Sequence, residues 1–152
     1  MADPITIIGA VGALCNIVES VTKTINTVNS IRMLWKEADL FLASLAAQLV
    51  ALRAALSTIR EWMELETETH HQLKMDLDAS LSCCRNLVDR LDAIFSQAND
   101  DPQASVRKLK VVYKAKDVHD LQKQVTLHTN AMTLLMAAYT WYFSRFLISN
   151  SC

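Results

Sequence analysis

Apolar residues recur at alternating spacings of three and four along four separate segments of this 152-residue chain. That spacing puts apolar side chains on one stripe of an α-helix, whereas a half-buried strand has a period of two. The four stripes are Ile7, Val11, Leu14, Val18, Val21, Ile25 and Val28; Trp35, Ala38, Leu42, Leu45, Leu49, Leu52, Leu56, Ile59 and Met63; Leu73, Leu77, Ser80, Cys84, Leu87, Leu91 and Ile94; and Val118, Leu121, Val125, His128, Met132, Leu135, Tyr139, Tyr142 and Phe146. The pattern predicts four amphipathic helices.

Glycine and proline are scarce, with two of each in the whole chain. A β-sandwich or barrel needs frequent turns that depend on such residues, so those folds are excluded. Both glycines, Gly9 and Gly12, lie in an apolar run, which excludes the glycine-rich phosphate loops of nucleotide-binding proteins. We therefore predict an all-α, antiparallel four-helix bundle, with a short extra helix in 105–116 between the third and fourth long helices.

Helix start signals agree with this division. Asp3 before Pro4 is typical of a helix N-terminus, and Asp117 precedes the last stripe. The sequence predicts breaks in helical structure near 29–34, 66–71 and 99–104. An antiparallel order brings the N-terminus, the 61–71 turn and the C-terminus to one end, and the first turn and 105–116 to the other.

The charges nearly balance, with 15 Lys and Arg against 16 Asp and Glu. Such a balance does not indicate a nucleic-acid partner. Cations do gather in one stretch, at Arg107, Lys108, Lys110, Lys114 and Lys116. This stretch is either a solvated helix face or a candidate contact for an anionic surface such as lipid headgroups.

The reactive residue types form no recognisable catalytic or metal-binding pattern. The four cysteines contain no CxxC pair, which favours reduced, intracellular thiols, and Cys84 falls on a core stripe. Glu68 and His71 have a metal-ligand spacing but stand alone, so we interpret His70 and His71 as solvated turn residues, and His128 as a core histidine. We expect no enzyme activity, no cofactor or metal, and no small-molecule substrate.

The N-terminal run is the most informative feature because it is apolar nearly all round. Besides its core stripe, it carries a second one formed by Ile5, Ile8, Gly9, Gly12 and Cys15, on which the two glycines are expected to allow close backbone approach. A helix of this kind is buried centrally, meets a partner or enters a membrane. Asn16 and Glu19 interrupt the run before it reaches the length of a membrane span, so no constitutive transmembrane helix is expected.

The C-terminal stretch Tyr139–Phe146 holds five of the ten aromatic residues. Trp141 and Phe143 fall off the core stripe, so we expect them to be exposed. Three interpretations stay open: an anchor at a membrane or partner, a face that once met a following domain, or an artefact of gene prediction. We accordingly divide the chain into a bundle, 1–138, and an aromatic-rich helix end and tail, 139–152.

Four segments resemble a known family: ADPITIIGAVGALCNIV, WKEADLFLASLAAQLVALRAALS, MDLDASLSCCRNLVDRLDA and KLKVVYKAKDVHDLQKQVTLHTNAMTLLM. Over residues 1–138 the chain resembles the N-terminal domain of fungal STAND (NOD-like receptor) proteins, related to HeLo-like helical domains. The resemblance implies a non-enzymatic role in heterokaryon incompatibility and immune-like programmed cell death. Some members act by oligomerising and inserting the N-terminal helix into a membrane.

We therefore expect a helical signalling domain that is cytoplasmic at rest and membrane-associated when activated. Its expected partners are further copies of itself, another protein or an anionic membrane. The alternative is a protein-interaction or scaffold domain that never touches lipid. The chain departs from the family pattern after Ala138 and includes no nucleotide-binding region, so a truncated paralogue, a stand-alone effector and an incomplete gene prediction all stay open.

Overall fold

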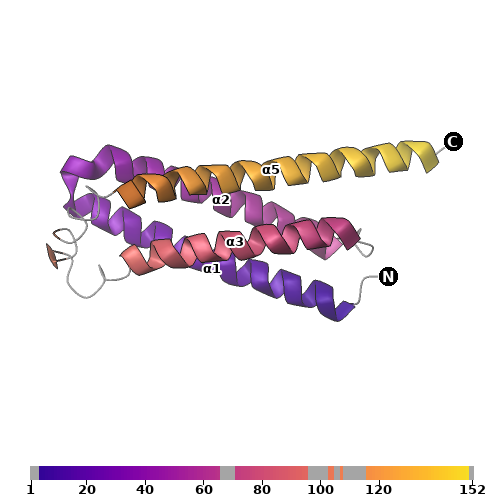
Figure 1. The fold of residues 1–152 in the computed structure, drawn as a ribbon, viewed down its shortest axis with the longest axis horizontal. Helices are drawn as coiled ribbons and strands as arrows, with labels where there is room; N and C mark the ends of the chain where they lie inside the picture. Colours follow the sequence, from indigo (N-terminus) through magenta and orange to yellow (C-terminus); the bar gives the residue numbers. More distant parts are fainter. Residues whose placement is uncertain (1–3, 66–70, 96–102, 105–106, 108–115, 151–152) are drawn as a thin grey trace.

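The computed structural model describes residues 4–65, 71–95, 103–104, 107 and 116–150, and they form a bundle of four long helices (Figure 1). The elements are α1 (Pro4–Leu34), the short 3-10 helix η1 (Lys36–Ala38), α2 (Asp39–Leu65), α3 (His71–Phe95) and α5 (Lys116–Asn150). The predicted all-α, antiparallel architecture is confirmed.

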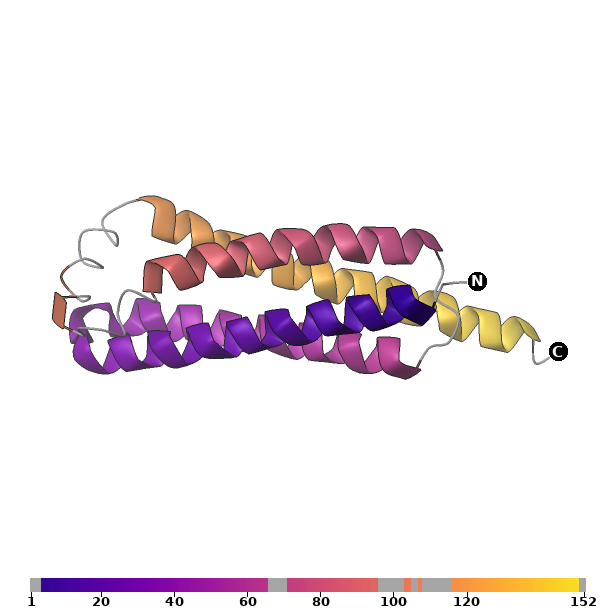
Figure 2. The same ribbon diagram turned by 90° about the horizontal axis from the view of Figure 1, so that it is seen from below.

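The four helices stand at the corners of a square in cross-section. α1 packs on α2 and α3, and α5 packs on the same two helices, so α1 and α5 are diagonally opposed. α1 and α3 run in one direction while α2 and α5 run in the other, as both views show (Figure 2). The two chain termini therefore lie at one end of the bundle and η1 at the other, which is the arrangement that the antiparallel order predicts.

The helix α2 carries the best-predicted part of the core. All nine residues of the predicted stripe from Trp35 to Met63 are buried, and the seven from Leu42 onward belong to α2. Each was assigned to the core from the alternation of three and four alone. A continuous stripe of this kind lets α2 face both of its neighbours, α1 and α5.

The buried side of α1 is wider than its predicted stripe. Leu14, Val21 and Val28 are completely buried, as expected, but Ile17 and Ile31 are buried too, whereas Val18 is only half-buried. Two threonines also face the core: Thr24 Oγ1 donates to the Ser20 carbonyl at 2.9 Å and Thr27 Oγ1 to the Lys23 carbonyl at 3.1 Å. These local bonds satisfy the hydroxyl donors, so both threonines can be buried.

The first predicted break is wrong. The sequence predicts an interruption near 29–34, but α1 continues through Leu34, and the chain turns at Trp35 and η1. The polar residue Ser30 fits within the helix because its Oγ donates to the Asn26 carbonyl at 3.0 Å. The next residue, Ile31, is buried at 2% exposure and anchors this turn in the core. The second break is placed correctly, since α2 ends at Leu65 and α3 begins at His71.

Burial along α5 declines toward its C-terminal half. Leu121, Val125 and Met132 are buried, but Leu135 and Tyr139 are only half-buried. The helix nevertheless runs unbroken past Ala138 to Asn150, so no change of secondary structure marks the predicted boundary between 138 and 139. α5 also projects beyond the ends of its neighbours in both views (Figures 1 and 2).

The predicted extra helix in 105–116 falls largely outside the described residues. Gln103, Ala104 and Arg107 are helical, and Lys116 already belongs to α5.

Candidate functional site

The second apolar stripe of α1 lies on a face that the bundle leaves open. Gly9 and Gly12 are exposed, and a Cβ atom added to either would meet no heavy atom within 4 Å. Cys15 is half-buried. The side chains of Ile5 and Ile8 lie outside the described part of the structure. The two glycines therefore do not serve close packing between the described helices, and the interpretation of α1 as a helix buried on all sides is wrong.

The opposite face of the same segment is firmly in the core. Ala10 is 8% exposed, Leu14 is fully buried and Ile17 is 4% exposed. Further along α1, Arg53 Nη1 of α2 donates to Thr22 Oγ1 at 3.5 Å, and Lys23 Nζ lies 3.6 Å from Asp92 Oδ2 of α3. α1 is thus an integral bundle helix whose N-terminal turns are covered on one side.

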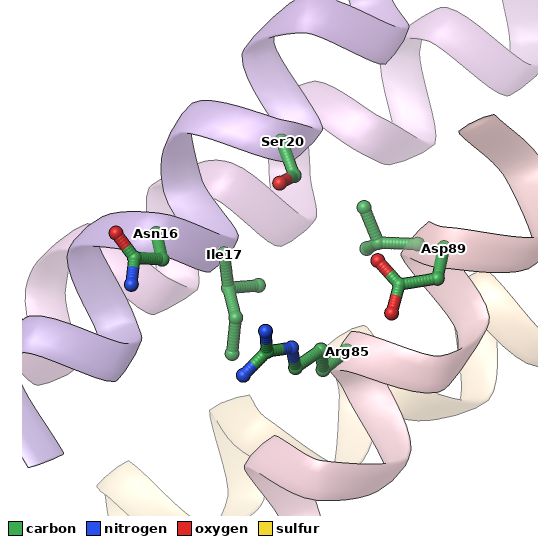
Figure 3. A pocket seen from close by; sticks show the side chains of 6 residues that line it. Asn16, Ile17, Ser20, Arg85 and Asp89 are labelled. Atoms are coloured by element: carbon green, nitrogen blue, oxygen red, sulfur yellow. The ribbon is translucent and has the colours of Figure 1, made fainter. Parts of the chain in front are cut away.

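A cleft of about 50 Å³ lies between α1 and α3 beside this face (Figure 3). Asn16, Ile17 and Ser20 line it from α1, and Arg85, Val88 and Asp89 from α3. Small-molecule sites usually have several hundred Å³. The cleft is therefore too small for such a ligand.

The predicted cationic contacts are only partly described. Arg107 is exposed; Lys108, Lys110 and Lys114 lie outside the described residues, as does the side chain of Lys116. Most of the predicted contact set therefore lies outside the described part of the chain.

The η1 corner exposes a group of apolar side chains that the sequence analysis missed. Met33, Leu34 and Leu40 are 79%, 53% and 85% exposed, respectively. Their sequence neighbours Arg32 and Asp39 form an ion pair that joins α1 to the start of α2, and the hydrogen bond and the charge of Asp39 hold the pKa of Arg32 above its ordinary value. The sequence could have predicted their exposure, because all three apolar residues lie outside the predicted core stripes.

The far end of α5 supplies a second exposed apolar surface. Tyr139 packs its ring edge-on against Trp62 of α2, with ring centroids 4.1 Å apart. Trp141 is 63% exposed, as predicted, and Leu134 is 70% exposed. Phe143 lies outside the described side chains. This helix end is therefore tied to α2 on one side and open to solvent on another.

The cysteine and histidine candidates behave as structural or surface residues. Burial, and then the neighbouring Cys83, raise the pKa of the Cys84 thiol to about 11, which leaves it protonated and unreactive at neutral pH. His128 is half-buried, and the ring of His119 lies edge-on to Phe41 at 5.4 Å. His70 and Glu68 lie outside the described residues, within which no cluster of three metal-ligating side chains occurs.

Within the described part of the chain, one helix, α2, is long and apolar enough to cross a membrane. It is also the helix whose stripe lies at the centre of the bundle core. A buried core helix passes the same test of length and composition.

No protein-family profile, curated protein or solved structure matches this chain.

Proposed function

We propose that this chain is a non-enzymatic helical signalling domain of the cell-death type found at the N-terminus of fungal STAND proteins. It acts by self-association, which releases the N-terminal part of α1 toward an anionic membrane. The observation that carries the proposal is the open face of α1 at Gly9 and Gly12, on a segment whose other face is buried. Such a segment has an apolar surface left over for a second environment.

The burial pattern sets how much of α1 is free to move. Each fully buried Leu, Ile or Val contributes about 1.5–3 kcal/mol. Among the described side chains, releasing α1 as far as Ile17 uncovers two of this kind, Leu14 and Ile17, at a cost of about 3–6 kcal/mol. Releasing the whole helix also uncovers Val21, Ile25, Val28 and Ile31, for about 9–18 kcal/mol. That cost is as large as the whole stability of a typical domain, about 5–15 kcal/mol, so we restrict the movement to residues 4–17.

Segment length determines how this part meets lipid. Fourteen helical residues, 4–17, span about 21 Å, less than the roughly 30 Å of a hydrocarbon core. The released segment therefore lies in the interface and enters one leaflet. The free energy of membrane contact must offset the free-energy cost of opening, because only a difference in interaction between two states shifts their populations.

The test is dye release from anionic liposomes by the purified full-length chain. Gly12→Glu places a charge on the open face without a steric clash, and Gly12→Ala is the matched control that keeps this face apolar. We expect release by the wild-type and Gly12→Ala proteins, and at least a tenfold slower release by Gly12→Glu at equal helicity. Equal release by all three proteins would contradict the role of this face.

The alternative is an interaction or scaffold domain without membrane activity, as a protein partner could cover the same open face. It is favoured by the integral place of α1 in the core, where Leu14 and Val21 are completely buried. This alternative would be supported if the folded wild-type protein, even when its copies are clustered, does not bind anionic liposomes.

A further inference from the structure

The buried positions of α1 and α2 follow one heptad frame that does not change phase at the corner between the two helices. From Ala10 to Met63 they alternate in spacings of four and three, and each is at most 8% exposed. The buried positions of this frame are Ala10, Leu14, Ile17, Val21, Thr24, Val28, Ile31, Trp35, Ala38, Leu42, Leu45, Leu49, Leu52, Leu56, Ile59 and Met63. A reversal of the chain does not require the two helices to share a frame, whereas a single continuous helix does. α1 and α2 therefore carry the pattern of one helix.

The corner between α1 and α2 is already close to helical. Trp35 is the one residue from 4 to 65 that lies outside a helix, with φ −118° and ψ 78°. Its N–H still donates to the Ile31 carbonyl at 2.9 Å, four residues back, as in an α-helix. Asp39 has α-helical dihedrals, φ −53° and ψ −47°, and residues 13–101 contain neither glycine nor proline. The residues of this hinge, 35–38, are therefore compatible with helix as well as with the bend.

The Arg32–Asp39 ion pair favours the bent form of the hinge. Residues seven apart in a continuous helix are separated by about 10.5 Å along its axis, so straightening breaks this pair. The two side chains are 41% and 52% exposed, and ion pairs this open to solvent contribute little to stability. The bend is thus held by a weak contact, and most of what stabilises the monomer is the packing of α1 on its neighbours.

Exchange of α1 between two copies preserves that packing. In the monomer, α1 packs on α2 and α3 of its own chain. When the hinge straightens, α1 extends beyond the η1 end of its own bundle (Figure 1) and can occupy the same place in a second copy, whose α1 does the same in return. The buried side chains then meet the same neighbours as before. The exchange costs the bend at the hinge and the independent motion of two copies.

The surface that such an exchange buries is large enough for a stable dimer. Each buried Leu, Ile or Val removes roughly 60–120 Å² of apolar surface from water. α1 contributes six large side chains of this kind: Leu14, Ile17, Val21, Ile25, Val28 and Ile31. For two copies, with the surface that they cover on the partner, the total is on the order of 1,400–2,900 Å², within or above the range of stable interfaces.

We propose that this chain forms a two-fold symmetric dimer with a second copy of itself by exchanging α1, in which α1, the hinge and α2 become one helix from Pro4 to Leu65. That helix is about 93 Å long, and the two bundles lie end to end with their η1 ends together. Because α1 must leave its place completely, folded copies exchange slowly and dimers form when chains fold together at high concentration. The inference goes beyond the proposed function, since the exchange requires no membrane.

Refolding of the full chain from urea under reducing conditions tests the exchange. One sample is refolded at about 1 mM and another at about 5 μM, and both are then compared at about 5 μM by size-exclusion chromatography with light scattering. We expect a dimer only after concentrated refolding, and we expect it to persist for hours after dilution, because dissociation requires unfolding. Small-angle X-ray scattering should show a dimer about twice as long as the monomer.

Lys36→Pro separates the straight hinge from the bent one. Lys36 is exposed and begins η1, a position where proline is tolerated, and the residue before it, Trp35, is not α-helical in the bend. In the continuous helix the same proline lies in the interior and disfavours an α-helical Trp35. We expect Lys36→Pro to lower the dimer association constant about a hundredfold or more, and Lys36→Ala, the matched control, to leave it unchanged.

A second variant acts in the opposite direction. Asp39→Asn removes the ion pair that only the bent hinge makes, so it should raise the dimer association constant about two- to fivefold. This variant keeps the inference testable if Lys36→Pro fails to fold, which circular dichroism melts of the monomers would show.

A wild-type chain that gives no dimer after concentrated refolding would overturn the inference. Equal dimerisation of folded Lys36→Pro and wild type would also overturn it, as would a dimer no longer than the monomer. An exchanged dimer in a wild-type protein that releases no dye would support the inference and remove the proposed function. Dye release by a wild-type chain that never forms this dimer would do the reverse.

Discussion

Replacing both Gly9 and Gly12 with alanine tests whether the N-terminal turns of α1 are formed and open on one side. Glycine inside a helix costs about 0.8–1.0 kcal/mol relative to alanine, because it loses more backbone freedom on folding. At either position the added methyl group meets nothing within 4 Å, so no steric term opposes the gain. We therefore expect the double variant to raise the free energy of unfolding by about 1.6–2.0 kcal/mol.

Urea unfolding followed by circular dichroism measures this change, and thermal melting provides a second reading. For a chain of this length, the gain corresponds to a rise of about 3–8 °C in Tm. The reasoning fails in either of two ways. A decrease in stability would mean that the two glycines pack against another part of the chain. No change would mean that the N-terminal turns are already unfolded in the native protein, so that helix propensity there has no effect.

The remaining predictions concern a buried thiol and the η1 corner. The pKa of the Cys84 thiol is raised from about 9 in the unfolded chain to about 11 in the folded one. Between pH 9 and 11 the folded state therefore binds more protons than the unfolded state. The free energy of unfolding should fall as the pH rises through this range, by up to about 2–3 kcal/mol. Urea unfolding measured across that pH range should show this loss of stability in the wild type and not in Cys84→Val. An equal loss in both proteins would mean that ionisation of Cys84 is not its cause. At the corner, Leu40→Glu should leave binding to anionic liposomes in co-sedimentation unchanged, because η1 lies at the opposite end of the bundle from residues 4–17, the proposed membrane segment. Weaker binding by a variant whose stability is within about 0.5 kcal/mol of wild type would contradict the assignment of membrane contact to the N-terminal end alone.

The sequence predicts the inner faces of these helices well. A three-four alternation determines both the helical period and the side that is buried, and the nine-residue stripe that continues from Trp35 through η1 into α2 was therefore correct throughout. The position of the first turn was predicted less well. Asn29 and Ser30 favour a break, but the burial of Val28 and Ile31 on either side keeps α1 helical through Leu34. Local preference was overridden by packing.

The outer surfaces were harder to predict, because their exposure depends on which neighbours each helix has. Gly9 and Gly12 were expected to permit close backbone approach, but no described helix approaches them. The exposure of Leu134 was not predicted, because the inner stripe of α5 accounted for its helical period by itself. Recognising it required knowing that α5 contacts two helices on one side and extends past them.

The central claim is that residues 4–17 of α1 separate from the bundle more readily than the rest of the helix. Native-state hydrogen exchange measures the opening free energy of each part directly. We predict that amides of residues 4–17 open at about 3–6 kcal/mol and that those of residues 21–34 open only with global unfolding. If both parts exchange at the global value, α1 is a single rigid element and the release mechanism is contradicted.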